Sequence, residues 1–346
     1  MLPERNQSFR RHGKQSSVAS TTASEKRASV QQVRRSVVDA SQLGTPILPR
    51  HSVLGHRRIE SKEILLTDLE FWTALVSDYT TTANRLPTLT TTKIRAGIPH
   101  PLRGLVWQSI AGARDTHLEG LYAQLSRESS PYEKVIGRDL ARTFPDVDMF
   151  RHEDGDGQLD LGKVLRAFSL YDNEVGYCQG LGFIVAPLLM NMSHGEAFCV
   201  LVRLMEAYEM RLMYTPTLAG LKLRLWQFEK LIEETVPLLA THLNALEIYP
   251  AMYASQWFLS LFAVTCPLQT LHRVYDVFLS EGPETMMRVG IALLVKNQDA
   301  ILSLDMEEVL SMLLGKSLWQ AYEDDDSLIA DVQALAPRID ADTLVE

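Results

Sequence analysis

Three helix-start signals, each followed by apolar residues at helical spacing, limit the fold of this chain more than any other feature. They are Ser130-Pro131-Tyr132-Glu133, Ser193-His194-Gly195-Glu196 and Asp305-Met306-Glu307-Glu308. In such a signal the first side chain accepts from a backbone N–H of the first turn, and the Glu three residues later reaches back to the cap. The first signal predicts a helix from Ser130 to about Arg142, ending before Pro145.

The apolar residues after Lys93 keep a spacing of three and four, as in Phe198, Leu201, Leu204, Met205 and Tyr208. Alternation with a period of two, bounded by turns, is nowhere convincing, and few hairpin signals occur. No repeat at a fixed period indicates a solenoid. We therefore predict an all-α domain with about a dozen or more helices.

The chain divides by composition into four parts. Residues 1–58 are rich in Ser, Arg, Gln and Thr, and we expect a disordered basic tail there. Residues 59–92 are expected to hold an N-terminal helix, from Ile59 to Tyr79, and then a linker, because Thr80–Thr92 contains seven Thr residues and Pro87. Residues 93–334 are the main helical domain, and 335–346 a C-terminal tail.

The net charge of −9 is unevenly distributed. Residues 1–58 carry eleven Lys or Arg and three acidic residues, a balance of +8, so the rest of the chain carries −17. An acidic body argues against nucleic acid as the main partner. A basic tail is compatible with contact to an anionic membrane surface.

Several classes of protein are disfavoured by the sequence. No apolar run reaches the 18 to 20 residues of a membrane span, and Met1–Ser20 lacks the apolar stretch of a secretory signal. Cys178, Cys199 and Cys266 are not at metal-ligand spacing, so we expect three reduced thiols, as is usual in the cytoplasm.

The familiar signatures of nucleotide-binding loops, zinc proteases and serine hydrolases are absent. Asp154-Gly155-Asp156-Gly157 resembles part of a calcium loop, but the alignment puts Lys163 where a bidentate carboxylate is required. We therefore predict no metal site. A cysteine hydrolase built on Cys178 is a weaker alternative; His194, His242 or His272 would have to act as the base.

Two short segments carry residues suited to chemistry. Asp139 and Arg142 lie three residues apart and can share a helix face, with Arg142 near the helix end. Their spacing alone is also that of an ordinary exposed pair. Tyr177-Cys178-Gln179-Gly180 places a Gln beside a Gly, and by itself this segment could be a structural turn.

Together these segments resemble the TBC-domain family of Rab GTPase-activating proteins. The family's IxxDxxR motif is matched by Ile136, Asp139 and Arg142, and its YxQ motif by Tyr177 and Gln179. Further matching blocks are Arg95–Pro99 with Arg103–Trp107, Ser255–Leu259 and Arg273–Gly282, the last with Tyr275 where many members have Trp. The resemblance covers about Lys93 to Leu314. The sequence around the motifs is most similar to the branch that includes the ecotropic viral integration site protein and its fungal relatives in secretory traffic.

The resemblance implies a multi-helix TBC domain that accelerates GTP hydrolysis by a GTP-bound Rab, acting in trans rather than turning over a substrate of its own. It implies that Arg142 and Gln179 are the catalytic pair. It also implies that Asp139 supports Arg142, that Tyr177 and Gly180 hold the glutamine loop, and that Arg103 and Trp107 are structural or near-interface support. GTP and magnesium would belong to the partner, so no cofactor of this chain's own is expected.

The family also includes an alternative for this chain, a catalytically silent Rab-binding scaffold. For an active member of this branch we expect a role in vesicle traffic. The expected location is the cytoplasm, with peripheral contact to Golgi or secretory-pathway membranes.

Overall fold

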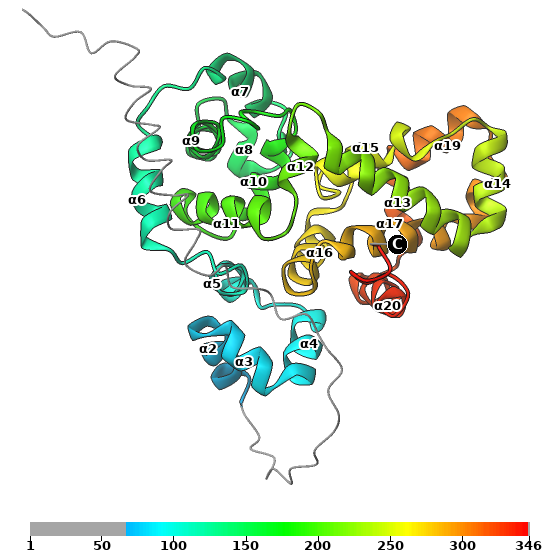
Figure 1. The fold of residues 1–346 in the computed structure, drawn as a ribbon, viewed down its shortest axis with the longest axis horizontal. Coiled ribbons are helices and arrows are strands. Elements are labelled where there is room, and N and C mark those ends of the chain that lie inside the picture. Colours follow the sequence, from blue (N-terminus) through cyan, green and yellow to red (C-terminus); the bar gives the residue numbers. More distant parts are fainter. Residues whose placement is uncertain (1–66, 345–346) are drawn as a thin grey trace, which may run out of the picture. The chain divides into compact units, whose positions relative to one another are not determined.

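The computed structural model describes residues 67–344, which belong to one compact unit, Leu65–Glu346. Every regular element in this range is helical, as predicted (Figure 1). The basic tail expected at residues 1–58, and the part of the next segment before residue 67, lie outside the described residues. No helix within 67–344 has the length and apolarity that a bilayer crossing requires.

The unit begins with α2 (Asp68–Ser77), α3 (Tyr79–Arg85) and α4 (Pro87–Ala96). The prediction that the Thr-rich stretch is a linker is therefore wrong, because this stretch forms most of α3 and the first half of α4. Pro87 begins a new helix at its first position, where a missing N–H costs nothing. Thr90 and Ile94 are buried on α4, which packs against α3 and α16 (Leu268–Glu281), and this packing outweighs the modest helix propensity of Thr.

A first group of helices surrounds α9, which is seen nearly end-on in Figure 1. Its neighbours are α6, α7, α8, α10 and α11, and the group is joined to the N-terminal helices through α5. The bounds are α5 (His100–Ile110), α6 (Thr116–Leu125), α7 (Glu133–Leu140), α8 (Asp148–Arg151), α9 (Asp156–Tyr171), α10 (Leu181–Leu189), α11 (His194–Glu206) and α12 (Arg211–Tyr214).

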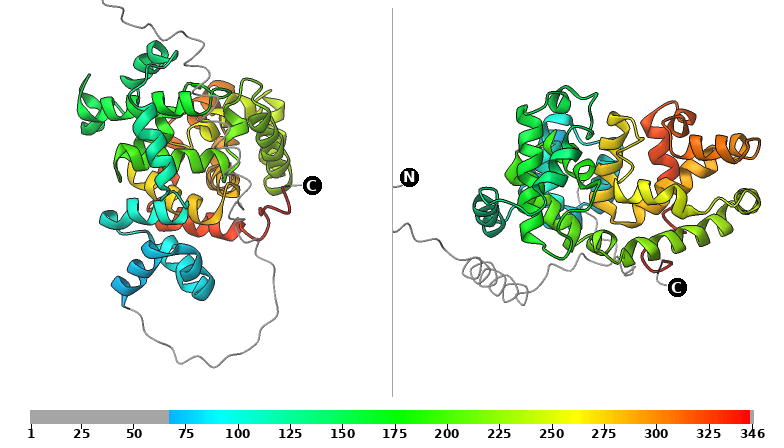
Figure 2. Two further views of the ribbon diagram at one scale, coloured as in Figure 1. Left: turned by 60° about the vertical axis from the view of Figure 1, so that its left-hand side comes forward. Right: turned by 90° about the horizontal axis from the view of Figure 1, so that it is seen from above.

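A second group of helices packs around α17, in which every residue from Thr285 to Leu294 is buried. Helix α17 spans Glu284–Lys296, and the other members of the group are α13 (Ala219–Thr235), α14 (Pro237–Ala245), η1 (Pro250–Met252), α15 (Ala254–Leu259), α16, α18 (Gln298–Ile301), α19 (Met306–Leu313), η2 (Ser317–Ala321) and α20 (Asp325–Leu335). Figure 2 shows this group, yellow-green to red, beside the first, in cyan and green. Helix α16 contacts α5 as well as α17, so it joins the two groups.

The helix-start signals are confirmed at two of three sites. In α11, Glu196 Oε2 accepts from the backbone N–H and the hydroxyl of Ser193, both at 2.8 Å. In α19, Asp305 and Glu308 exchange such bonds, at 3.0 and 3.1 Å. The third helix, α7, begins later than predicted, at Glu133, because Ser130 instead caps a preceding turn by accepting from the N–H of Tyr132 at 3.0 Å.

The C-terminal segment expected to be a tail is packed as far as it is described. Ile339 and Leu344 are buried. Their backbone carbonyls accept from two side chains of the second group, Arg288 Nε at 2.7 Å and Gln227 Nε2. Buried polar groups of this kind need partners, so the segment up to 344 completes the core instead of leaving it.

Candidate functional site

Arg142 lies in the turn that follows α7, two residues beyond the helix end. The helix was predicted to continue to this residue, but it ends at Leu140. Asp139, in the last turn of α7, is buried, and its Oδ1 accepts from a terminal nitrogen of the Arg142 guanidinium. The Arg142 side chain is nevertheless 50% exposed. The carboxylate thus holds the guanidinium group of an arginine that is half exposed at the surface.

The turn around Arg142 is fixed on its other side by Thr143. The Thr143 hydroxyl donates to the backbone carbonyl of Asp139 at 2.8 Å, and the residue is buried. Its oxygen would lie 2.9 Å from a Cβ placed on Gly182 in α10, so the turn packs closely against that helix. The backbone on either side of Arg142 is therefore held in place, by Asp139 before it and by Thr143 after it.

Gln179 lies on an exposed loop between α9 and α10. Gly176 lies within this loop with φ +58°, and a Cβ there would lie 2.3 Å from the Tyr132 hydroxyl oxygen. Gly180 follows with φ +104° and is the N-cap residue just before α10. Both positions need the left-handed conformation that glycine adopts without strain, and the first also needs the missing side chain. The two glycines therefore determine the course of the loop that presents Gln179.

Asp139 connects the two predicted catalytic residues. Its second carboxylate oxygen accepts from the Tyr177 hydroxyl, so one buried side chain ties the arginine turn to the glutamine loop. Burial raises the pKa of Tyr177, and the Asp139 carboxylate raises it further, so the phenol stays protonated and keeps donating. The structure thus brings together Asp139, Arg142 and Tyr177, with Gln179 two residues along the loop.

Arg211 is a residue of this region that the sequence analysis missed. Its guanidinium donates to both carboxylate oxygens of Asp172, at 2.6 and 2.9 Å, and to Glu174 at 2.7 Å. The first of these two acids also accepts from the backbone N–H groups of Glu174 and Val175. Arg211 therefore fastens the segment that leads into the glutamine loop. The acid pair before Gly176 was the only signal in the sequence, because its partner is more than thirty residues away.

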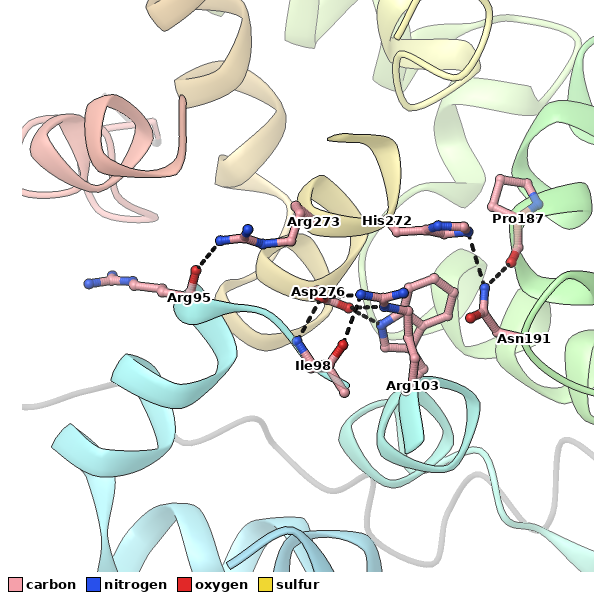
Figure 3. Close-up of polar contacts among 9 residues, drawn as sticks. Arg95, Ile98, Arg103, Pro187, Asn191, His272, Arg273 and Asp276 are labelled. Carbon is pink, nitrogen blue, oxygen red and sulfur yellow. Dashed lines mark hydrogen bonds and ion pairs between the residues drawn. The ribbon is translucent and has the colours of Figure 1, made fainter. Parts of the chain in front are cut away.

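Arg103 and Trp107, expected to be structural or near-interface support, are both buried. Arg103 Nε and Trp107 Nε1 donate to the same oxygen of Asp276, at 3.1 and 2.8 Å, and Asp276 is fully buried in α16 (Figure 3). The other Asp276 oxygen accepts from the Ile98 N–H at 3.1 Å. These contacts join α5 to α16, so both residues hold the two groups of helices together.

His272 lies beside this cluster and contacts Asn191 at 3.2 Å (Figure 3). Burial lowers its pKa to about 4, and the nearby Arg103 guanidinium contributes to the shift. The imidazole is therefore neutral at physiological pH, which suits a core position between α16 and α10.

The alternative chemistries find little support in the described part of the chain. Cys178 Sγ has a weak contact with the Gln179 carbonyl, at 3.8 Å, and burial, followed by Asp139, raises the pKa of the thiol. A thiol held protonated is a poor nucleophile. Within residues 67–344 no three His, Cys, Asp or Glu side chains are grouped so that they could hold a metal ion.

The described residues thus form an all-helical domain with two functional segments. One carries Arg142, anchored by Asp139, and the other carries Gln179, with a glycine on either side along the loop. The family model described as RabGAP TBC domain matches residues 158–346, so the chain belongs to that family. The matched range contains Tyr177 and Gln179 and begins after Asp139 and Arg142.

Individual relatives agree with this assignment. The human ecotropic viral integration site 5 protein homolog is 46% identical over 217 residues, which are 63% of this chain and 27% of that protein. GTPase-activating protein GYP5 of Eremothecium gossypii is 38% identical over 256 residues, 73% of this chain and 30% of that protein. The predicted resemblance to this branch is confirmed, and the chain spans about a third or less of the length of these relatives.

The fold also matches a solved structure, the TBC domain of a Chlamydomonas flagellar RabGAP. The similarity has a TM-score of 0.60 with 26% sequence identity, and it covers 78% of this chain and 96% of that one.

Proposed function

We propose that this chain accelerates GTP hydrolysis by a GTP-bound Rab-family GTPase, and that Arg142 and Gln179 enter the partner's nucleotide site. Membership of the RabGAP TBC family and the name of the GYP5 relative support the activity. The observation that carries the residue assignment is the Asp139 carboxylate, which accepts from both Arg142 and Tyr177. An arginine anchored by a buried carboxylate that a second loop shares is well placed to act together with that loop.

Arg142 supplies positive charge to the reaction. A guanidinium is planar, always protonated and able to bridge several phosphate oxygens. In phosphoryl transfer the catalyst mostly positions groups and stabilises charge, and an arginine provided in trans is worth about 10³ to 10⁵ in rate. That range corresponds to about 4 to 7 kcal/mol of transition-state stabilisation.

Gln179 orients the attacking water. A carboxamide both donates and accepts hydrogen bonds, so it can hold a water with its oxygen while its NH₂ group donates to a phosphate oxygen. The rigid glycine-framed loop matters here, because a displacement of about 1 Å in a positioning group can cost about a hundredfold in rate. Tyr177 and Arg211 act on Gln179 through this loop.

Single-turnover GTP hydrolysis by a panel of purified Rabs tests the proposal. We expect the wild-type chain to accelerate one or a few of them. We expect Arg142→Ala to lose at least a thousandfold and Gln179→Ala at least a hundredfold of the maximum rate. Arg138→Ala is the matched control, because Arg138 is an exposed arginine of α7, just before the turn that holds Arg142, and its Nε donates to the Lys134 carbonyl at 3.2 Å.

The scaffold alternative predicts a different pattern. Some Rabs would bind with measurable affinity, none would be accelerated, and Arg142→Ala and Gln179→Ala would behave like the wild type. Equal rates for the wild type and both variants would therefore refute the catalytic assignment.

A role in vesicle traffic at secretory-pathway membranes forms part of the proposal. It is supported by the +8 charge of residues 1–58, since each Lys or Arg near an anionic leaflet contributes about 1 kcal/mol. Sedimentation of the full chain with phosphatidylserine vesicles tests the membrane contact. We expect binding that salt weakens, and equal binding to neutral phosphatidylcholine vesicles would contradict it.

A further inference from the structure

The first half of α13 presents apolar side chains to solvent beside α12. Leu223 and Trp226 lie one turn apart on α13 and are 52% and 50% exposed, and Leu212 on α12 is 54% exposed. The two helices touch at Gly220, where a Cβ would lie 2.8 Å from the Leu212 Cβ (Figure 1). We call Leu212, Leu223 and Trp226 the apolar patch.

The apolar patch is not needed for the packing of α13. The opposite side of that helix buries Leu221, Phe228, Leu231 and Ile232, which supply its contacts with the core. Scattered exposed apolar residues are ordinary, but neighbouring ones that include a half-exposed Trp are typical of protein contacts. The exposed Lys222 and Lys230 lie on the same side of the helix, so the apolar patch has the charged border common at interfaces.

The apolar patch is linked to the candidate catalytic site through α12. Helix α12 begins at Arg211, which donates to Asp172 and Glu174 just before the glutamine loop. Leu212 is the next residue after this clamp. The segment before the glutamine loop is therefore linked, through Arg211 and α12, to the start of α13.

Two catalytic side chains cannot hold a protein partner by themselves. A specific protein interface buries about 800 Å² on each side, and most of its energy comes from a few anchors that are often Trp, Tyr or Arg. An Arg and a Gln offer little apolar area. A partner whose nucleotide site covers Gln179 needs a neighbouring apolar surface.

We propose that the apolar patch docks the GTP-bound GTPase that receives Arg142 and Gln179, with Trp226 as its main anchor. This inference rests on the proposed function. The occupant is a folded GTPase with a complementary apolar surface beside its nucleotide site. Because the apolar patch contacts protein and not the phosphates, it contributes to binding and leaves the chemical step unchanged.

The test is single-turnover hydrolysis with the full chain in excess over a GTP-loaded Rab. For Trp226→Ala we expect the half-saturating concentration to rise tenfold or more, while the maximum rate stays within about twofold. Trp226→Phe, which keeps an aromatic anchor, should recover most of the affinity. Leu238→Ser is the matched control, because Leu238 on α14 is 69% exposed and lies outside the apolar patch.

The opposite signature is expected for Arg142→Ala, which should lower the maximum rate at an unchanged half-saturating concentration. Failure of the two proposals can therefore be told apart. Unchanged half-saturation in Trp226→Ala, with Arg142→Ala inactive, overturns the docking surface and leaves the activity in place. If Trp226→Ala does not fold, Leu212→Ser and Leu223→Ser replace it with the same expectation.

An inactive wild-type chain would refute the proposed function, and binding would then decide the docking surface. The measurement is the equilibrium affinity of the chain for each GTP-loaded Rab of the panel. Loss of affinity in Trp226→Ala supports the apolar patch. Equal affinity of wild type and variant, or no binding to any Rab, overturns it.

Discussion

The substitution Tyr177→Phe removes one hydroxyl group. It tests whether the arginine turn and the glutamine loop share one anchor or are independent of each other. The hydroxyl donates to Asp139, which also holds Arg142. A hydrogen bond to a charged group is worth about 1.5 to 3 kcal/mol, and the ring of Phe fills the same space. We expect a loss of about 2 kcal/mol of unfolding free energy, or about 4 to 8 °C in melting temperature for a unit of this size.

The same variant should lower catalysis without lowering affinity. Loosening the glutamine loop misplaces Gln179, so we expect the maximum single-turnover rate to fall about ten- to a hundredfold while the half-saturating concentration stays the same. Denaturant unfolding and the GTP hydrolysis assay measure the two effects. Asp139→Asn is the companion variant, because it weakens both anchored bonds and should cost at least as much in stability and rate.

A double-mutant cycle gives the sharpest test of the shared anchor. If Asp139 couples the two segments, the stability losses of Tyr177→Phe and Arg142→Ala should not add, and the coupling should be about 0.5 kcal/mol or more. Strictly additive losses, together with a wild-type maximum rate for Tyr177→Phe, would refute the reasoning that Asp139 joins the two segments.

Four further outcomes can be measured on purified variants. Gly176→Ala should lose over 1 kcal/mol more unfolding free energy than Gly112→Ala in denaturant unfolding. The two glycines have nearly the same φ, +58° and +60°, but only Gly176 lacks space for a Cβ. Equal losses would contradict this. The pKa of His272 is about 4 in the folded protein, below its ordinary value of 6.5. The unfolding free energy should therefore fall by up to about 3 kcal/mol as the pH drops from 6.5 toward 4, because the unfolded state is protonated first. His272→Gln should remove this pH dependence. Arg211→Ala should lower the maximum hydrolysis rate about tenfold, and Arg211→Lys should restore only part of it, because an ammonium lacks the fork that reaches both acids; full recovery would argue against that geometry. Trp107→Ala should cost about 3 to 5 kcal/mol by calorimetry, and a near-native melting temperature would contradict its core position.

The helical class and the pair of segments that carry Arg142 and Gln179 were accessible from the sequence, because spacing and caps are local. The way in which Asp139 joins these two segments could not be predicted from the sequence. Its partner Tyr177 lies 38 residues away, and no local pattern states which of several tyrosines reaches a given carboxylate. The Arg211 clamp is hidden for the same reason.

Two errors in the organisation of the chain also have a physical cause. Thr-rich and C-terminal segments have weak local preferences, so tertiary contacts decide their structure. Thr90 is buried on α4, which packs against the distant helix α16, and the carbonyl of Ile339 accepts from Arg288. Both contacts involve residues far away in sequence, which no window of ten or fifteen residues contains.

The single carboxylate at position 139 has a consequence for how such a domain can change over generations. One nucleotide substitution that turns Asp139 into Asn would loosen both working side chains together, while the apolar patch, which lies on other helices, would keep its residues. A protein that accelerates hydrolysis and one that only holds its partner are then separated by a single mutational step. In a duplicated gene, that step would supply a competitor of the original protein without any change to the surface it presents.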